Sequence, residues 1–205
     1  VTIPLWEDCM TRLAPLNRAD LPDLEDHLAL AEASMGFLPN SLLIMARRPE
    51  LVKAFVGMMA QVNLGGALSP GLRQMIAYMA SRSAGCLYCQ AHTHHGAENA
   101  DDLDAQKLAQ IWEYETSDLF SEAERVALTV AQLSAQVPNG VSDADFEALK
   151  PHFDEDQIVD IVAVISAFGF LNRWNDTLAT PLEEVPVAHA SDHLAKSGWT
   201  TGKHA

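Results

Sequence analysis

The sequence is poor in basic residues, in cysteine and in long apolar runs, and each shortage excludes a class of protein. Only 13 lysine and arginine residues stand against 28 aspartate and glutamate residues, which gives a net charge of −15 at pH 7. Such a charge repels phosphate backbones and anionic lipid surfaces, so nucleic acids and membranes are not expected partners. Three cysteines in 205 residues are too few for the disulfide framework of a small secreted protein.

The apolar runs predict neither a membrane span nor a signal peptide. The longest run, residues 158–171, is interrupted by Asp160 and falls below the roughly 18–20 residues that a membrane-spanning helix needs. Residues 1–10 contain two acidic side chains and lack the basic and apolar regions of a signal peptide. These features predict a cytoplasmic protein. Cys9 stands alone in this first segment and is expected to be inert.

The composition is that of one globular domain. Hydrophobic residues make up 48% and charged residues 20% of the sequence, which is enough apolar material for a proper core. A length of 205 residues fits a single domain, which we expect over residues 1–185. Small, polar and histidine residues dominate after Pro186, so residues 186–205 are expected to form an arm that docks on a partner subunit or stays mobile.

Apolar residues recur at helical spacing along almost the whole chain, and the alternating pattern of β-strands is scarce. The sequence therefore predicts an all-α fold. Two stripes are expected to face the core, and they consist of Leu51, Ala54, Phe55, Met58 and Val62 and of Val126, Val130, Leu133 and Val137. The expected helices cover residues 22–34, 41–47, 50–64, 70–84, 87–99, 102–114, 122–136, 143–150 and 155–175.

Three helix starts carry the sequence signals of an N-terminal cap. One is a serine followed by proline at the first helical position, and two have the spacing of a capping box. The caps are Ser69 with Pro70, Ser121 with Glu124, and Asp154 with Gln157. The last of these helices contains the apolar segment 158–171, which we expect at the centre of the fold.

The segment from Gly85 to His95 has a composition that core packing does not explain. It places two thiols, Cys86 and Cys89, and three imidazoles close together. Gly85 is suited to end the preceding helix, which puts Cys86 in the first turn of the next one, where free N–H groups and the helix dipole favour a thiolate. In a Cys-x-x-Cys pair the second thiol lies one turn along on the same face, where it can close a disulfide.

A proton acceptor follows the second thiol. His92 lies three residues after Cys89, so on a helix it is beside that thiol, and its ordinary pKa of about 6.5 suits proton transfer near neutral pH. We predict that His92 is the base, that His95 orients or relays to it, and that Glu98 pairs with a histidine three or four residues earlier. Cys86 is then the more exposed sulfur, and Cys89 is the more easily deprotonated one.

Zinc binding is the main chemical alternative for this segment. Four ligands occur in successive steps of three residues, at Cys86, Cys89, His92 and His95. Each step rotates by about 60° around the helix axis, so the four ligands sweep half of the circumference and cannot converge on one tetrahedral ion. We therefore expect no metal and no organic cofactor. Two inert buried thiols are the remaining alternative.

The core of the motif, Cys-x-Tyr-Cys-x-Ala-His over residues 86–92, resembles that of the alkylhydroperoxidase D-like branch of the carboxymuconolactone decarboxylase superfamily. Three further segments are similar to its subgroup of peroxidase-related proteins, and they are residues 36–40, 46–50 and 172–176. The resemblance extends over most of the chain. It implies an all-helical fold, assembly into symmetric oligomers, and a cysteine pair that reduces hydroperoxides or recycles a peroxiredoxin.

The sequence departs from this family pattern at two positions of the implied proton relay. The family has a glutamate twelve residues before the first cysteine and a histidine four residues after the second, where this chain has Gln74 and Thr93. Gln74 cannot accept a proton. His92 is similar to the histidine of the peroxidase-related subgroup, and Asp160 is a candidate replacement acid because a buried carboxylate needs a partner.

We therefore expect a thiol-dependent oxidoreductase of the alkylhydroperoxidase type. A thiolate of the Cys86/Cys89 pair attacks a hydroperoxide and becomes a sulfenic acid, and the other thiol closes the disulfide. A thiol reductant or redox protein restores both thiols. A disulfide reductase for a protein partner and a non-catalytic ligand-binding or redox-sensing module are the alternatives. The resemblance and the apolar helix also predict a homo-oligomer.

Overall fold

The computed structural model describes residues 11–205, and the regular structure in that range is helical, which confirms the all-α prediction. Residues 1–10, with Cys9 and the segment compared with a signal peptide, lie outside the described residues. The α-helices are α1 (Glu25–Met35), α2 (Asn40–Met45), α3 (Pro49–Leu64), α4 (Pro70–Ser83), α5 (Leu87–Glu98), α6 (Ala105–Ala109), α7 (Glu122–Ser134), α8 (Asp143–Glu147), α9 (Glu155–Leu178) and α10 (Glu184–His193).

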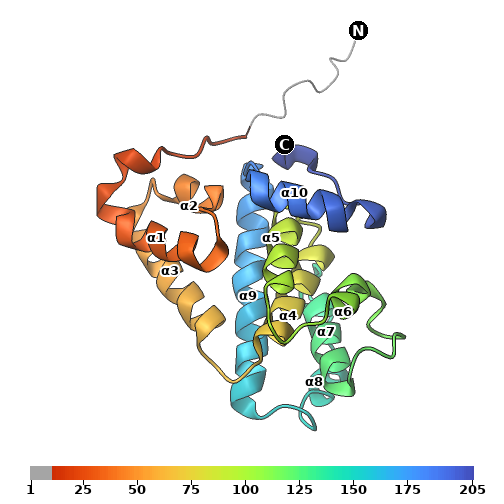
Figure 1. Cartoon of the computed structure of the whole chain (residues 1–205). Coiled ribbons are helices and arrows are strands. Elements are labelled where there is room, and N and C mark those ends of the chain that lie inside the picture. Colours follow the sequence, from red (N-terminus) through yellow and green to blue (C-terminus); the bar gives the residue numbers. More distant parts are fainter. Residues whose placement is uncertain (1–10) are drawn as a thin grey trace.

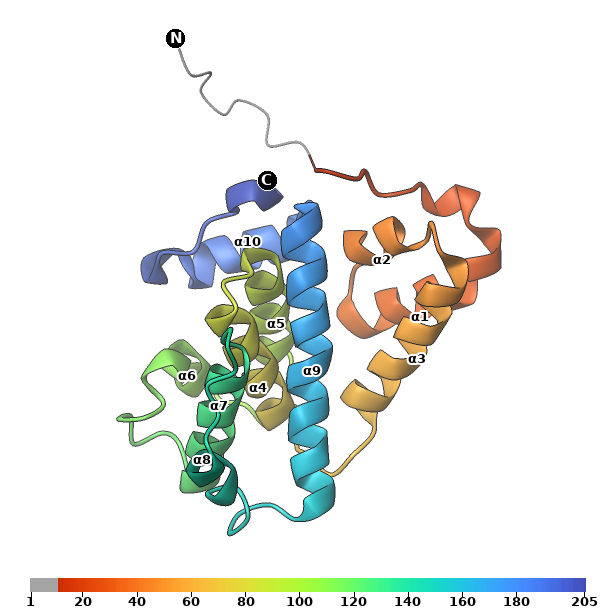
Figure 2. The ribbon, with the colours of Figure 1, turned by 180° about the vertical axis from the view of Figure 1, so that it is seen from behind.

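Helix α9 is the centre of the fold. It contacts α4, α5 and α7 on one side, and on the other it contacts α3, which packs with α1 and α2 (Figure 1). The view from behind shows the same two groups of helices on either side of α9 (Figure 2). The prediction that the apolar segment 158–171 is central is therefore confirmed.

The apolar character of α9 has two explanations. Its 24 residues are long and apolar enough to cross a membrane by length and composition alone. Packing in the core also explains it, because α9 is covered by other helices and a central core helix can be as apolar as a membrane-spanning one. Three of its large side chains are nevertheless exposed in the single chain, namely Val159 at 65%, Val162 at 43% and Phe170 at 38%. The predicted homo-oligomer would cover such side chains.

Local sequence signals place several helix ends as predicted. Ser69 Oγ accepts the N–H of Leu72 at 3.3 Å, which confirms the cap of α4. Both predicted capping boxes are present, at the starts of α7 and α9. Gly85 follows the end of α4 with φ of 75°, a conformation that glycine adopts without strain, and α5 then begins directly after Cys86.

The buried face of α3 is rotated from the predicted stripe. The core side chains are Val52, Phe55 and Val56, whereas Leu51 and Met58 are 36% and 42% exposed. The face turns because α3 packs against α9 on one side and against α1 and α2 on the other. Tertiary contacts thus decide between two apolar faces that the sequence alone leaves nearly equivalent.

Several predicted helices are shorter in the structure, among them those predicted over residues 122–136 and 102–114. Helix α7 ends at Ser134, so Val137 of the predicted stripe lies beyond it and is 84% exposed. The helix predicted over residues 102–114 is replaced by the short helix α6 and a 3-10 turn over residues 111–113. Asp104 caps the start of α6 by accepting the N–H of Gln106. Because this cap satisfies a free backbone N–H, α6 begins at Ala105 rather than at residue 102, where the spacing of apolar residues predicts the start.

Residues 184–205 fold back on the same chain, which corrects the prediction of an arm on a partner subunit or a mobile tail. Helix α10 packs against α5. Beyond it, Trp199 donates its Nε1–H to the carbonyl of Leu87 at 3.0 Å, and Leu182 donates its N–H to the carbonyl of His204 at 2.9 Å. Trp199 is 6% exposed and His204 is fully buried, so the segment is part of the packed unit.

We expect Asp160→Ala to loosen the turn between α3 and α4 and to leave thiol reactivity unchanged. Asp160 Oδ2 accepts the N–H of Ala67 at 2.8 Å, and loss of this bond should lower the free energy of unfolding by about 1 kcal/mol. Urea unfolding measures the loss. Asp101→Ala is the control, because that exposed carboxylate makes no hydrogen bond to the residues described. Equal stability of the two variants would contradict the assignment.

Candidate functional site

The two thiols of the motif lie at the start of α5, inside the fold. Cys86 is the N-cap residue, and its Sγ accepts the N–H of Cys89 at 3.4 Å. Both are free thiols, 0% and 2% exposed, in a small apolar cluster with Tyr88, Leu171 and Leu182. The prediction that Cys86 is the more exposed sulfur is therefore wrong, because the C-terminal segment packs on this end of α5.

Burial dominates the surroundings of Cys89. Asn175 of α9 donates an Nδ2–H to Cys89 Sγ at 3.5 Å. Burial raises the pKa of the Cys89 thiol well above its ordinary value, and the neighbouring Cys86 raises it further, while Asn175 opposes the shift only in part. The surroundings of Cys89 therefore favour its neutral thiol and do not support the prediction that Cys89 is easily deprotonated.

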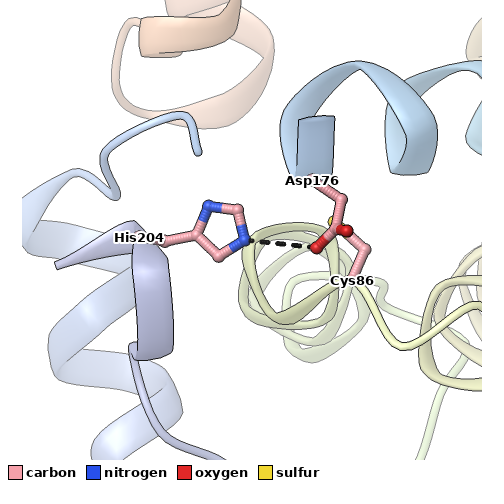
Figure 3. Close-up of side chains that lie close together, drawn as sticks. All are labelled: Cys86, Asp176 and His204. Carbon is pink, nitrogen blue, oxygen red and sulfur yellow. Dashed lines mark ion pairs between the residues drawn. The ribbon is translucent and has the colours of Figure 1, made fainter. Parts of the chain in front are cut away.

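Cys86 meets two titratable side chains from the other end of the sequence. Its Sγ, a carboxylate oxygen of Asp176 and a ring nitrogen of His204 all lie within 4.8 Å of one another (Figure 3). Asp176 comes from the last turn of α9, and His204 comes from the C-terminal segment. His204 Nε2 is 3.8 Å from Asp176 Oδ1, and Lys203 Nζ lies 2.8 Å from Asp176 Oδ2. A thiol, an imidazole and a carboxylate thus share one small volume.

The backbone decides which nitrogen of His204 can accept a proton. Nδ1 lies 2.8 Å from the carbonyl oxygen of Thr180, and since a carbonyl only accepts, Nδ1 carries the hydrogen. Nε2 of the neutral ring then carries a lone pair. Burial lowers the pKa of His204, although the Thr180 carbonyl and Asp176 oppose that shift. The three side chains are also of the types that ligate metals.

Several buried polar atoms around the thiols have no hydrogen-bond partner among residues 11–205. They are Asn172 Nδ2 and Oδ1, Asn175 Oδ1, Thr180 Oγ1 and His204 Nε2. Buried polar groups without partners are costly and rare in native proteins, and they are retained where water, a substrate or a proton is bound. Of these side chains, His204 borders Cys86 and Asn175 borders Cys89, so a water or a ligand can hydrogen-bond beside the thiols.

A second polar network lies one turn further along α5. His92 Nε2 forms a hydrogen bond with Glu183 Oε2 at 2.7 Å, and Tyr88 donates its hydroxyl hydrogen to Glu183 Oε1 at 2.8 Å. The backbone N–H of Asn40 donates to the same carboxylate. The rings of Tyr88 and His92 stack with their centroids 4.1 Å apart. Glu183 therefore joins α5 to the first residue of α2 and to the start of α10.

Glu183 keeps its charge although its side chain is only 11% exposed. Burial by itself would raise the pKa of Glu183, but the charge and hydrogen bond of His92, together with the hydrogen bonds from Asn40 and Tyr88, outweigh burial and lower it. His92 thus directs its Nε2 to this carboxylate. Within the described part of the chain His92 forms no hydrogen bond with either thiol, so the predicted base of Cys89 is not hydrogen-bonded to it.

Gln74 and Asp160, the two predicted relay residues outside the motif, are not brought to the thiols. Gln74 packs against Gly96, where a Cβ would be 3.0 Å from Gln74 Oε1, about two turns beyond the second thiol. Asp160 accepts the N–H of Ala67 near the opposite end of α9. It precedes Asp176 by sixteen residues of one helix, which corresponds to about 24 Å.

His95 and Glu98 also have other partners than predicted. The ring of His95 meets Phe37 edge-on, with centroids 5.7 Å apart, and burial lowers the pKa of His95. Glu98 pairs with two histidines of α10, at 3.0 Å from His189 and 3.6 Å from His193, and not with a histidine of its own helix. The two helices are packed side by side, so the carboxylate finds its partners across the interface.

Three residues of the site, Asp176, Glu183 and His204, were not found from the sequence. Asp176 ends the segment 172–176 that carries part of the family resemblance, so a signal for it was present. Glu183 and His204 have no such signal. Glu183 and its partner His92 are 91 residues apart, and no local sequence pattern marks a contact over that separation.

A cavity of about 490 Å³ adjoins the thiol site between α4, α7 and α9. Ala84, Asn172 and Asp176 line it. Asn172 carries amide atoms without a hydrogen-bond partner in the described range, and Asp176 also borders Cys86. The cavity is large enough for a small organic molecule, and only the Asp176 side of its wall is shared with the thiols.

Comparison with known sequences points to one family. The sequence profile of the Carboxymuconolactone decarboxylase family matches residues 49–133. The uncharacterized protein YnjA of Escherichia coli (strain K12) is 28% identical over 134 residues, which are 65% of this chain and 71% of that protein.

Solved structures extend the likeness over most of the chain. The debrominase Bmp8 in its apo form is 34% identical, with a TM-score of 0.84 over 90% of this chain and 99% of that one. Its cysteine-to-alanine variant in complex with 2,3,4-tribromopyrrole also has a TM-score of 0.84. The alkylhydroperoxidase AhpD core of an uncharacterized peroxidase-related protein from Ralstonia eutropha JMP134 is 26% identical, with a TM-score of 0.73 over 86% of this chain and 94% of that one.

We expect Glu183→Gln to lower the free energy of unfolding by about 2 kcal/mol at pH 7, because a charged acceptor of three hydrogen bonds is lost. The pKa of Glu183 is lower in the folded chain than its ordinary 4.5, so its contribution is present above about pH 4.5 and is lost as the pH falls through the folded pKa. Urea unfolding at several pH values measures both effects. Glu184→Gln, on an exposed neighbour, is the control. A stability gap between wild type and Glu183→Gln that widens below pH 4.5 would contradict a stabilising charge on Glu183.

Proposed function

This chain belongs to the carboxymuconolactone decarboxylase superfamily, in the branch of alkylhydroperoxidase D-like, peroxidase-related proteins, and from that premise we propose that it is a thiol-dependent oxidoreductase that reduces hydroperoxides. The observation that carries the proposal is the approach of Cys86, Asp176 and His204 to within 4.8 Å. A nucleophile beside a base, with a third group next to the base, is the general arrangement of an activated nucleophile. The unpaired polar atoms around it support a site for substrate and water.

Cys86 is the thiol proposed to attack the peroxide. His204 Nε2 takes the Cys86 proton, and the carboxylate of Asp176, 3.8 Å away, stabilises the imidazolium that results. The position of Cys86 at the N-terminus of α5 adds the favourable field of the helix for a thiolate. The raised pKa of Cys89 suits a second thiol that keeps its proton until the disulfide closes.

The proposed reaction takes two electrons from the two thiols. The Cys86 thiolate forms an S–O bond with one peroxide oxygen, the O–O bond breaks, and the leaving alkoxide takes the proton from His204. Cys89 then attacks the sulfenic sulfur, the S–S bond forms, and hydroxide leaves as water with the Cys89 proton. A thiol reductant or a redox protein returns two electrons and two protons, which restores both thiols.

The peroxide needs a route to buried sulfur. We propose the cavity of about 490 Å³, because its wall contains both Asn172 and Asp176. The unpaired amide of Asn172 can hydrogen-bond the peroxide, and Asp176 borders both the cavity and Cys86. The C-terminal segment closes the other side, where Gly202 lies against Leu87.

A second candidate function is reductive debromination of an aromatic ring. Bmp8 is more similar to this chain than the Ralstonia peroxidase-related protein, both in identity and in TM-score. In this reaction the same dithiol supplies two electrons, so that the C–Br bond breaks, bromide leaves, the ring carbon gains a proton, and a disulfide and a second proton are formed. Bromide release from 2,3,4-tribromopyrrole, compared with hydroperoxide loss under the same excess of dithiol, decides between the two substrates.

Two other functions draw on the same residues. A disulfide reductase would reduce a protein disulfide much faster than any peroxide, and a redox-sensing module would consume one equivalent of peroxide without turnover. The proposed assembly is a homo-oligomer, in which the exposed apolar side chains of α9, Val159, Val162 and Phe170, are covered by another subunit.

Cysteine variants test which thiol attacks the peroxide and which one closes the disulfide. Cys86→Ser is expected to abolish peroxide reduction altogether, because it removes the attacking sulfur. Cys89→Ser is expected to lose turnover and yet form one sulfenic acid per chain on Cys86, which a dimedone adduct located by peptide mass detects. Cys9→Ser is the control and should retain full turnover. Unimpaired turnover in both Cys86→Ser and Cys89→Ser would refute the proposal.

The pH dependence of thiol alkylation tests the base. His204→Asn can keep the hydrogen bond to the Thr180 carbonyl but lacks the Nε2 acceptor, so the apparent pKa of Cys86 alkylation should rise and peroxide reduction should slow by a factor on the order of 10². His92→Gln preserves a donor to Glu183 and is the matched comparison. If only His92→Gln shifts the profile, His92 is the base, as the sequence motif predicts.

A further inference from the structure

A second cluster of titratable side chains lies between the last residue of α5, Glu98, and helix α10. The two helices lie beside one another in Figure 1. Contacts advance along both helices in step: Glu183 meets His92, His189 meets His94, and the last residue of α5, Glu98, meets His189 and His193. The proposed thiol chemistry uses none of the residues at this end. The cluster is about 17 Å from the start of α5.

Three side chains of the cluster have the spacing of a metal site. Glu98 Oε2 is 3.0 Å from His189 Nδ1, and Glu98 Oε1 is 3.6 Å from His193 Nε2. One ligand atom of each residue lies within 4.8 Å of the others. In a tetrahedral zinc site with bonds near 2.0 Å, neighbouring ligand atoms are about 3.3 Å apart, so these distances need little adjustment.

The helix supplies two of the ligands with the right register. His189 and His193 are four residues apart on α10, which places them on one face, and their rings stack with centroids 4.5 Å apart. Glu98 approaches that face from α5. Ligands from two separate elements can converge on one ion, unlike the successive steps of three residues in the cysteine motif.

A supporting contact fixes the ring of the most buried ligand. His189 Nε2 lies 2.8 Å from His94 Nδ1, so the nitrogen that does not face Glu98 is engaged by a second histidine. Metal-binding histidines nearly always use their other ring N–H in this way, because the bond fixes both the orientation of the ring and the nitrogen that binds. His94 is itself buried and held edge-on by Tyr78, with centroids 5.3 Å apart.

We propose that Glu98, His189 and His193 bind a zinc ion that ties α10 to the end of α5. The two nitrogens and one carboxylate form a donor set that zinc accepts, with water in the fourth position. The site departs from the expectation that the protein binds no metal, which was argued from the geometry of the cysteine motif. An ion bound there clamps the helix that begins beside Glu183 and leads to His204.

The alternative is an ordinary hydrogen-bonded ion pair between Glu98 and the two histidines, without a metal. Without zinc, the metal site and the simple ion pair contain the same contacts. Only the metal site has an affinity for zinc that depends on all three side chains being present. His193 and Glu98 are 46% and 44% exposed, so either can be replaced without disturbing the core.

Calorimetric titration with Zn²⁺ tests the proposal. The Cys86→Ser/Cys89→Ser double variant removes the thiols as competing ligands, and it is expected to bind one zinc per chain. Adding His193→Ala or Glu98→Gln to that background should weaken the affinity at least tenfold, whereas His152→Ala, an exposed histidine elsewhere, should leave it unchanged. Absence of zinc binding in the double variant, or equal binding after His193→Ala, would overturn the proposal.

Thermal unfolding gives a readout that does not depend on catalysis. At zinc concentrations a hundredfold above Kd, Tm of the double variant should rise by roughly 5–10 °C, and His193→Ala should lose this rise. Without zinc, the double variant and the double variant with His193→Ala should have Tm values within a few degrees of each other. That result would show that the His193→Ala protein is folded. A zinc-induced rise that persists in His193→Ala would assign the metal to other residues. Because the thiols are absent, the outcome is independent of the proposed peroxide chemistry.

Discussion

The carboxylate of Glu183 is the contact on which the arrangement of the site depends. It is nearly buried, and it accepts hydrogen bonds from Tyr88 and His92 of α5 and from the backbone of Asn40 at the start of α2. An unpaired buried charge costs several kcal/mol, so this position is tolerable only when all of these donors are in place. The start of α10 is thereby fixed against the middle of α5. The position of α10 in turn positions residues 194–205, which follow it.

The C-terminal segment then returns to the start of α5 and covers the thiols. Trp199 donates to the carbonyl of Leu87, and the backbone and ring of His204 bind Leu182 and Thr180. These contacts bring the imidazole of His204 to the side of Cys86, with its Nε2 3.8 Å from Asp176 Oδ1. The same packing of α10 on α5 aligns Glu98 with His189 and His193. Helix α5 thus borders the proposed proton acceptor at its start and the proposed zinc site at its end.

The two thiols lie one turn apart and have different surroundings. Cys86 caps α5 and borders a histidine and a carboxylate, whereas Cys89 is enclosed by apolar atoms and the amide of Asn175. Such a difference suits a reaction in which one sulfur attacks and the other waits as a thiol. A dithiol of this kind can reduce a peroxide or remove bromine from a ring, because both reactions consume the same two electrons. In the proposed function, the cavity beside Asp176 is the part of the site that distinguishes the two substrates.

Local chemistry alone determined the helical fold, the caps at Ser69, Ser121 and Asp154, the turn at Gly85, and the placement of Cys86 at a helix start. These features depend on neighbours within one or two helical turns, so their signals are present in the sequence. The buried face of α3 and the fold of residues 184–205 were decided by contacts between distant helices. The same is true of the partners of the site. His92 faces Glu183 rather than a thiol, and His204 lies beside Cys86. Both contacts join parts of the chain that are far apart in sequence, so they form only when the whole chain is packed and the cost of burying Glu183 is offset by its hydrogen bonds.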